Sequence, residues 1–150
     1  LRGCVVSRAT APSRAEFPVF KTLTTRWFDN DLYGHMNNAV HYQLFDTVVN
    51  GHLLEEGLLE LHNSETAFLV VESGCSYFSE IGFPDVITAG LRVAKLGSSS
   101  VTYNVALFRG DSDVAAAAGH FIHVHVDRAT RKPRPMDLRA RQVLGELVCA

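Results

Sequence analysis

The spacing of hydrophobic and polar residues changes along the chain. After residue 66, apolar and polar positions alternate, which is typical of strands with one face in a core. The alternating segments span residues 67–79, 85–96, 99–109 and 114–127. Gly97-Ser98 and Gly110-Asp111 interrupt this pattern and predict tight turns. We therefore expect consecutive strands throughout most of the second half of the chain.

Residues 38–56 follow a helical period instead. One apolar stripe recurs every four residues and consists of Val40, Leu44 and Val48. A neighbouring stripe consists of His41, Phe45, Val49 and His52. Because the two stripes together form a wide face, we expect a largely buried helix. Asn37 or Asn38 can cap its start, and Gly57 can end it.

Residues 18–28, ahead of this helix, are β-branched and aromatic and predict a first strand, while residues 29–37 predict a loop. Residues 136–148 predict a short terminal helix. A strand, a long helix and then consecutive strands indicate an α+β domain with a curved antiparallel sheet that buries the helix. Small residues in the last strand would let the helix approach closely, namely Ala115, Ala117 and Gly119.

The composition fits one globular domain. The chain has 150 residues, of which 47% are hydrophobic and 20% are charged. The net charge of −2 argues against a nucleic-acid partner, which needs a basic surface. No apolar run approaches the roughly 20 residues of a membrane span. The cysteines, Cys4, Cys75 and Cys149, are too few and scattered for a disulfide framework, which indicates reduced thiols and a cytoplasmic protein.

The N-terminal segment has a different composition. Arg2, Arg8 and Arg14 lie among Ser, Thr and Ala, and no acidic residue precedes Glu16. Such a segment faintly resembles an organelle transit peptide. A flexible leader is the interpretation that we prefer, with residues 1–16 as the leader and residues 17–150 as a single domain.

Two carboxylates, Asp29 and Asp31, lie between the first strand and the helix. Backbone NH groups at a helix start are oriented donors with partial positive charge. A carboxylate near such donors can act as a base or nucleophile in acyl transfer, while the NH stabilises the developing oxyanion. An Asp before a helix is also a common cap or turn residue, and spacing alone favours that structural role.

The whole segment around these carboxylates carries a family resemblance. Asp29-Asn-Asp-Leu-Tyr-Gly-His-Met-Asn-Asn-Ala-Val-His-Tyr42 resembles the D-x-D-x-x-G-H-[VM]-N-N-x-x-Y signature of the 4-hydroxybenzoyl-CoA thioesterase-like branch of the hotdog superfamily. The following helix, the strand count and the chain length also match, so the resemblance covers residues 18–127. It implies a hotdog fold, a five-stranded antiparallel sheet wrapped around one long helix, and a homodimer or homotetramer in which sheets join.

The resemblance assigns roles within the signature. Asp31 resembles the family's catalytic carboxylate, which activates water or attacks the thioester directly. Asp29 is expected to support the loop, and Gly34 to permit its conformation. The NH near Asn38 resembles the donor to the thioester carbonyl. His35 belongs to the signature, and we expect it to pack the loop or form hydrogen bonds rather than to react.

A second segment resembles the turn that contacts coenzyme A phosphates in this family. It contains Lys95, Ser98, Ser99 and Ser100, whose hydroxyl and NH groups can bind phosphate oxygens. The alternative is an ordinary polar hairpin turn. A basic stretch after the last strand can meet the nucleotide or remain solvated, and consists of Arg128, Arg131, Lys132 and Arg134.

Metal and nucleophile sites receive less support. Alternation places His123 and His125 on one strand face and His120 on the other, so they do not converge on a metal. Asp29-x-Asp31 resembles the start of a magnesium phosphatase motif, but Tyr33 stands where that motif has Thr. Cys75 is expected to be a small buried side chain. We therefore expect neither a metal nor a redox cofactor.

The predicted function is hydrolysis of an acyl-CoA to a free acid and coenzyme A. A non-catalytic acyl-CoA-binding protein, acting as a sensor or binding module, is the main alternative, and the presence of Asp31 favours the enzyme. A hotdog dehydratase is a further alternative, but its His/Asp or His/Glu arrangement is not found here.

Overall fold

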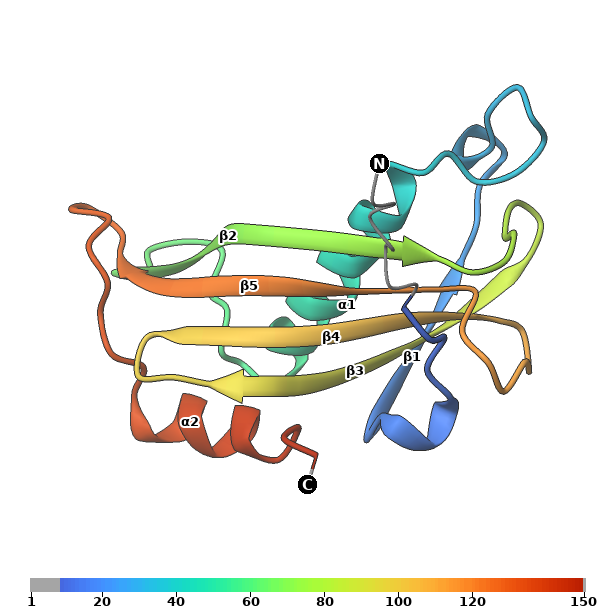
Figure 1. Cartoon of the computed structure of the whole chain (residues 1–150). Coiled ribbons are helices and arrows are strands. Elements are labelled where there is room, and N and C mark those ends of the chain that lie inside the picture. The colour runs from blue at the N-terminus through green and yellow to red at the C-terminus, as the bar shows by residue number, and fades with distance from the viewer. Residues whose placement is uncertain (1–8, 150) are drawn as a thin grey trace, which may run out of the picture.

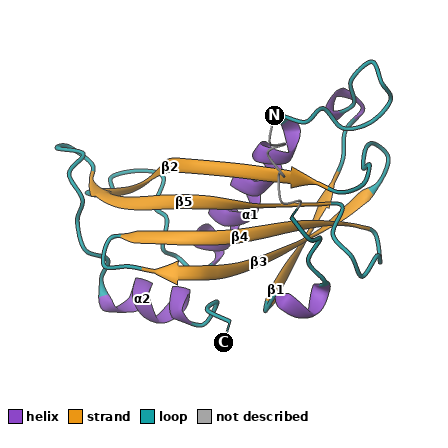
Figure 2. Ribbon diagram, viewed as in Figure 1, coloured by secondary structure: helices purple, strands orange, loops and turns teal. Residues whose placement is uncertain are grey.

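The computed structural model describes residues 9–149. The chain forms one antiparallel sheet of five strands in the order β1-β3-β4-β5-β2, with a long helix across one face (Figures 1 and 2). The strands are β1 (Val19–Thr24), β2 (Thr66–Tyr77), β3 (Val86–Leu96), β4 (Ser100–Arg109) and β5 (Ala117–Asp127). The helices are α1 (Val40–Glu55) and α2 (Leu138–Gly145), with 3-10 turns η1 (Arg14–Glu16) and η2 (Trp27–Asp29). This architecture confirms the predicted α+β hotdog fold.

Helix α1 supplies the centre of the core. Phe45, Val49 and Leu53 are completely buried, and they belong to the same core cluster as side chains of β3, β4 and β5. Gly119 of β5 lies beneath Phe45, because a Cβ atom at Gly119 would meet the Phe45 ring at 2.6 Å. The small residue predicted for a close helix approach therefore performs that role. Gly57, at φ +68°, follows the helix end as predicted.

The C-terminal segment covers the part of the β3 edge that β1 does not pair with. Strand β1 pairs with β3 only from Val86 to Leu91. Beyond that stretch, the Val93 NH donates to the Leu147 carbonyl at 2.9 Å, just after α2. Leu144 and Leu147 are buried in the core. Helix α2 thus protects a strand edge that would otherwise be open to another chain.

The described N-terminal residues contact the connection between β4 and β5. The Ala115 NH donates to the Pro12 carbonyl at 3.0 Å, and the Arg14 NH donates to the Asp113 carbonyl at 3.1 Å. Residues 12–16 are therefore held against the connection between β4 and β5, and the domain boundary expected at residue 17 stays a prediction. Residues 1–8 of the expected leader lie outside the described residues. Among residues 9–149, no helix is both long and apolar enough to cross a membrane.

Candidate active site

Asp29 closes the loop that leads into α1. Its side chain is buried, with Oδ2 accepting from the Arg26 NH at 2.8 Å and Oδ1 accepting from Arg26 Nη2 at 3.1 Å. The Asp29 carbonyl accepts from the Asn37 NH at 2.8 Å. Both carboxylate oxygens are therefore occupied, and this residue holds the two ends of the loop together rather than facing a substrate.

Asp31 occupies a tight turn in the same loop. Its Oδ1 accepts from the Tyr33 NH at 2.8 Å, and its carbonyl accepts from the Gly34 NH at 3.1 Å. Gly34 has a φ of +87°, a left-handed conformation that favours glycine. Within residues 9–149, Asp31 Oδ2 has no hydrogen-bond partner, and the side chain is half-buried. The turn thus presents one free carboxylate oxygen.

One backbone and one side-chain hydrogen bond fix this loop on the connection between β2 and β3. The Met36 NH donates to the Ile81 carbonyl at 2.8 Å, and the Phe83 NH donates to Asn30 Oδ1 at 2.9 Å. A Cβ atom at Gly82 would lie 2.8 Å from Asn30 Oδ1 and 3.2 Å from the Met36 nitrogen. Gly82 therefore allows the two segments to pack directly against each other.

Among residues 9–149, the Asn38 peptide NH just before α1 is left without an acceptor. Asn37 Oδ1 accepts from the Ala39 NH at 2.9 Å, and the Asn37 carbonyl accepts from the Val40 NH at 2.9 Å. The Asn37 side chain, rather than that of Asn38, thus binds a backbone NH just ahead of the helix, whose N-cap residue is Ala39 and has no side-chain cap of its own. The Asn38 NH has no acceptor within the described part of the chain. It is an oriented donor at the positive end of the helix.

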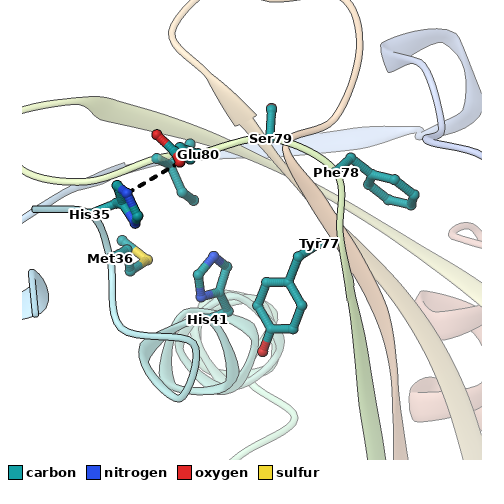
Figure 3. A pocket seen from close by; sticks show the side chains of 8 residues that line it. His35, Met36, His41, Tyr77, Phe78, Ser79 and Glu80 are labelled. Carbon is teal, nitrogen blue, oxygen red and sulfur yellow. Dashed lines mark ion pairs between the residues drawn. The ribbon is translucent and has the colours of Figure 1, made fainter. Parts of the chain in front are cut away.

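His35 and Glu80 stand at the rim of a pocket beside this helix start (Figure 3). His35 Nε2 lies 3.2 Å from Glu80 Oε1, and both side chains are substantially exposed. An ion pair in this setting contributes about 1 kcal/mol or less. The pocket has a volume of about 280 Å³, and its walls include Met36, His41 and Tyr77. Asp31 instead borders a larger hollow of about 500 Å³ with Trp27, Asn30, Leu32 and Gly34.

Tyr77 and His41 were missed as site residues by the sequence analysis. Tyr77 Oη donates to the Asn38 carbonyl at 2.7 Å, and the rings of Tyr77 and His41 meet edge to face at 4.8 Å. Burial raises the pKa of Tyr77, so its hydroxyl remains a donor. The only signal in the sequence is that Tyr77 falls at the end of an alternating segment. Its contact with the helix start depends on tertiary packing.

The turn predicted to contact coenzyme A lies far from Asp31 within the chain. Asn30, next to Asp31, contacts Phe83 just before β3, whereas Ser98 and Ser99 follow the other end of that strand. A strand the length of β3 spans roughly 35 Å. Figure 1 shows the turn between β3 and β4 at the opposite end of the sheet from the loop that contains Asp31. A single chain therefore does not bring Lys95, Ser98, Ser99 and Ser100 to the candidate site.

The turn itself is well fixed. The Ser98 carbonyl accepts from the Met136 NH at 3.0 Å, and the Ser99 carbonyl accepts from the His125 NH at 2.7 Å. Arg134, in the nearby basic stretch, lies 3.7 Å from both Glu65 and Asp127. This arginine is partly neutralised by acidic neighbours, which weakens its attraction for a phosphate.

The strand histidines have separate surroundings. His123 is buried among Phe68, Tyr103 and Phe121, with ring centroids 5.1–5.6 Å away, and burial lowers its pKa to about 4. His120 lies 3.2 Å from Glu72, in a pair exposed to solvent. In residues 9–149 no group of three or more His, Cys, Asp or Glu side chains is arranged to hold a metal ion.

Comparison with known proteins places this geometry in a family. The model of the thioesterase-like superfamily matches residues 25–144. The solved PA5185 protein from Pseudomonas aeruginosa strain PAO1 is 45% identical, with a TM-score of 0.89, covering 92% of this chain and 96% of that chain. Slr0204, a 1,4-dihydroxy-2-naphthoyl-CoA thioesterase from Synechocystis, is 17% identical, with a TM-score of 0.76, covering 85% of this chain and 96% of its own.

A curated relative matches over a shorter stretch. The uncharacterized protein YsmA of Bacillus subtilis (strain 168) is 24% identical over 89 residues, which are 59% of this chain and 60% of YsmA. The match to the family model covers the Asp31 loop, helix α1, and the sheet from β2 through β5. The chain belongs to the thioesterase-like superfamily, and its fold is the hotdog fold.

Proposed function

We propose that this protein is an acyl-CoA thioesterase that hydrolyses a coenzyme A thioester to a carboxylic acid and coenzyme A. The observation that carries the proposal is the Asp31 Oδ2 atom, without a partner among residues 9–149, on a loop that leads to the Asn38 NH, which also lacks an acceptor there. The signature from Asp29 to Tyr42 is the basis for assigning the chain to the 4-hydroxybenzoyl-CoA thioesterase-like branch.

Two routes use the same groups. In the first, a water oxygen attacks the thioester carbon while Asp31 Oδ2 takes a proton from that water. The Asn38 NH donates to the oxyanion that forms, aided by the helix start. Collapse of this intermediate breaks the C–S bond, and Asp31 returns the proton to the departing thiolate. In the second route, Asp31 attacks the carbon and expels the thiolate, and water then hydrolyses the resulting mixed anhydride. Neither route needs a metal or a redox cofactor.

A dimer would bring the proposed coenzyme A turn of one chain close to the Asp31 loop of the other. Within residues 9–149, strand β2 is an edge strand that pairs with β5 alone, and its Val70 and Val71 side chains are exposed. Strand β2 runs parallel to β4, so the turn before Ser100 lies at the Thr66 end of the sheet. If two β2 strands pair antiparallel about a two-fold axis, the partner's copy of this turn moves to the end that holds Asp31.

Exposed apolar side chains support such an assembly. Trp27, Phe28, Leu32 and Tyr33 are each at least 77% exposed, and all lie on the loop around Asp31. Apolar residues gathered in this way usually mark an interface. We propose a homodimer, or a tetramer built from it, in which Lys95, Ser98, Ser99 and Ser100 contact the phosphates of the acyl-CoA bound beside the partner's loop.

Release of free thiol from a panel of short-chain, medium-chain, long-chain and aromatic acyl-CoAs tests the function. We expect steady turnover with at least one class. Tight binding of acyl-CoA without any thiol release would instead support a non-catalytic binding protein. If none of these acyl-CoAs bound or released thiol, both the thioesterase role and the binding role would be excluded for this protein.

A further inference from the structure

His41 contacts the peptide unit that carries the proposed oxyanion donor. Its Nδ1 lies 3.3 Å from the Asn37 carbonyl oxygen. That carbonyl and the Asn38 NH belong to the same planar peptide unit. Figure 3 shows the imidazole rising from the first turn of α1 between Met36 and Tyr77. A group that binds one end of this peptide therefore acts on the donor at its other end.

The Asn37 carbonyl determines which nitrogen of the His41 imidazole carries the proton. A carbonyl oxygen can only accept, so Nδ1 must carry the hydrogen and Nε2 keeps a lone pair. Burial lowers the pKa of His41, partly opposed by its backbone hydrogen bonds with Asn37 and Asn38. The ring is therefore neutral at pH 7, and it donates to Asn37 through Nδ1. The other ionisable groups around it are Tyr77, which donates to the Asn38 carbonyl, and the rim pair of His35 and Glu80.

Two effects on the Asn38 NH follow. A donor on the Asn37 carbonyl, together with the Val40 NH at 2.9 Å, prevents rotation of that peptide plane. Hydrogen bonds in a chain also polarise one another, so donation to the carbonyl makes the NH of the same peptide a stronger donor. Both effects stabilise the negative charge that develops on the thioester oxygen in the transition state. Neither strengthens binding of the neutral substrate to the same extent, so they act on kcat more than on KM.

We propose that His41 is a positioning residue that aims and polarises the Asn38 NH toward the thioester oxyanion. This role rests on the proposed thioesterase function. The residue does not touch the reacting atoms, and acts through the Asn37–Asn38 peptide.

Three variants separate this role from simple packing. His41→Asn keeps an amide donor near the position of Nδ1. His41→Gln moves the amide toward the position of Nε2. His41→Phe keeps a ring against Tyr77 without any donor. We expect kcat to fall about tenfold in the Gln and Phe variants with little change in KM, less than the ~10²–10³-fold for outright loss of an oxyanion donor. His41→Asn should stay within about threefold of the wild type.

A packing role predicts the opposite order, because His41→Phe would then be the most active variant and His41→Asn the least. That order would overturn the proposal. A second readout is the ¹H chemical shift of the Asn38 backbone amide in the ligand-free protein. It should move upfield in the Gln and Phe variants and be retained in the Asn variant. An identical shift in all four proteins would overturn the positioning role, whereas a wild-type protein inactive on every acyl-CoA would overturn the proposed function instead.

Discussion

The Asn37 NH donates to the Asp29 carbonyl at 2.8 Å and so joins the two ends of the loop that carries Asp31. Asp29 also binds the Arg26 NH through its buried carboxylate. The Asp29 side chain therefore supports the loop that carries Asp31 from within. Asp31 Oδ2 has no partner among residues 9–149.

Replacing Asp29 should destabilise the protein. Asp29→Ala removes both acceptors from Arg26 and leaves a backbone NH without its partner. We expect a loss of roughly 1–3 kcal/mol in the free energy of unfolding, measured by urea denaturation. Asp111→Ala is the control, because Asp111 is exposed in a turn and should change stability by less than about 0.5 kcal/mol. Equal effects in the two variants would contradict the supporting role of Asp29.

Two glycines provide a matched test of the Asp31 turn. Gly34 has a φ of +87°, and a Cβ added there would have no neighbour within 4 Å, so Gly34→Ala introduces backbone strain without a steric clash. We expect it to cost about 1 kcal/mol or more and to reduce turnover, since the turn orients Asp31. Gly51→Ala in α1 meets no neighbour either and should stabilise the helix by about 0.5–1 kcal/mol. Thermal unfolding of both variants measures the difference, and stabilisation by Gly34→Ala would refute the strained turn.

His123 should make the protein acid-sensitive. Its pKa is about 4 in the folded state against the ordinary 6.5. The unfolded chain therefore binds more protons between these values, so stability is full above about pH 6.5 and falls as the pH drops toward 4. The shift corresponds to roughly 3 kcal/mol. His123→Leu should flatten the dependence of unfolding free energy on pH, and an exposed-site control, His62→Leu, should not. An unchanged slope in His123→Leu would show that this histidine does not carry the effect.

The proposed dimer should depend on the β2 edge. Val71→Lys places a charge on an exposed edge position, which should weaken strand pairing between two copies. Light scattering during size exclusion should then show a shift toward monomer together with weaker binding of acyl-CoA. Val114→Lys alters a similarly exposed valine that lies outside the five strands and should leave the assembly unchanged. A monomeric wild-type protein that is fully active would rule out the shared site.

Local patterns predicted the elements of this fold, and tertiary pairing determined the rest. The apolar stripe containing Phe45 and Val49 identifies α1, and Gly57 marks its end, because both signals act within a few residues. The contact of Tyr77 with Asn38 arises from how β2 packs against the start of α1, which no local pattern encodes. Likewise, Ser98 and Asp31 belong to segments that resemble family motifs, but only the direction of β3 shows that they lie at opposite ends of the sheet.

The most direct test is the turnover of Asp31→Asn, which replaces the free carboxylate oxygen with an amide of similar shape. We predict that kcat for the best acyl-CoA falls by about 10²–10⁴-fold, while the Kd of a non-hydrolysable ketone analogue stays within a few-fold of wild type. Asp111→Asn should retain full activity, as an exposed turn residue away from this loop. Wild-type kcat in Asp31→Asn, with confirmed folding, would contradict the assignment of Asp31 as the reacting group.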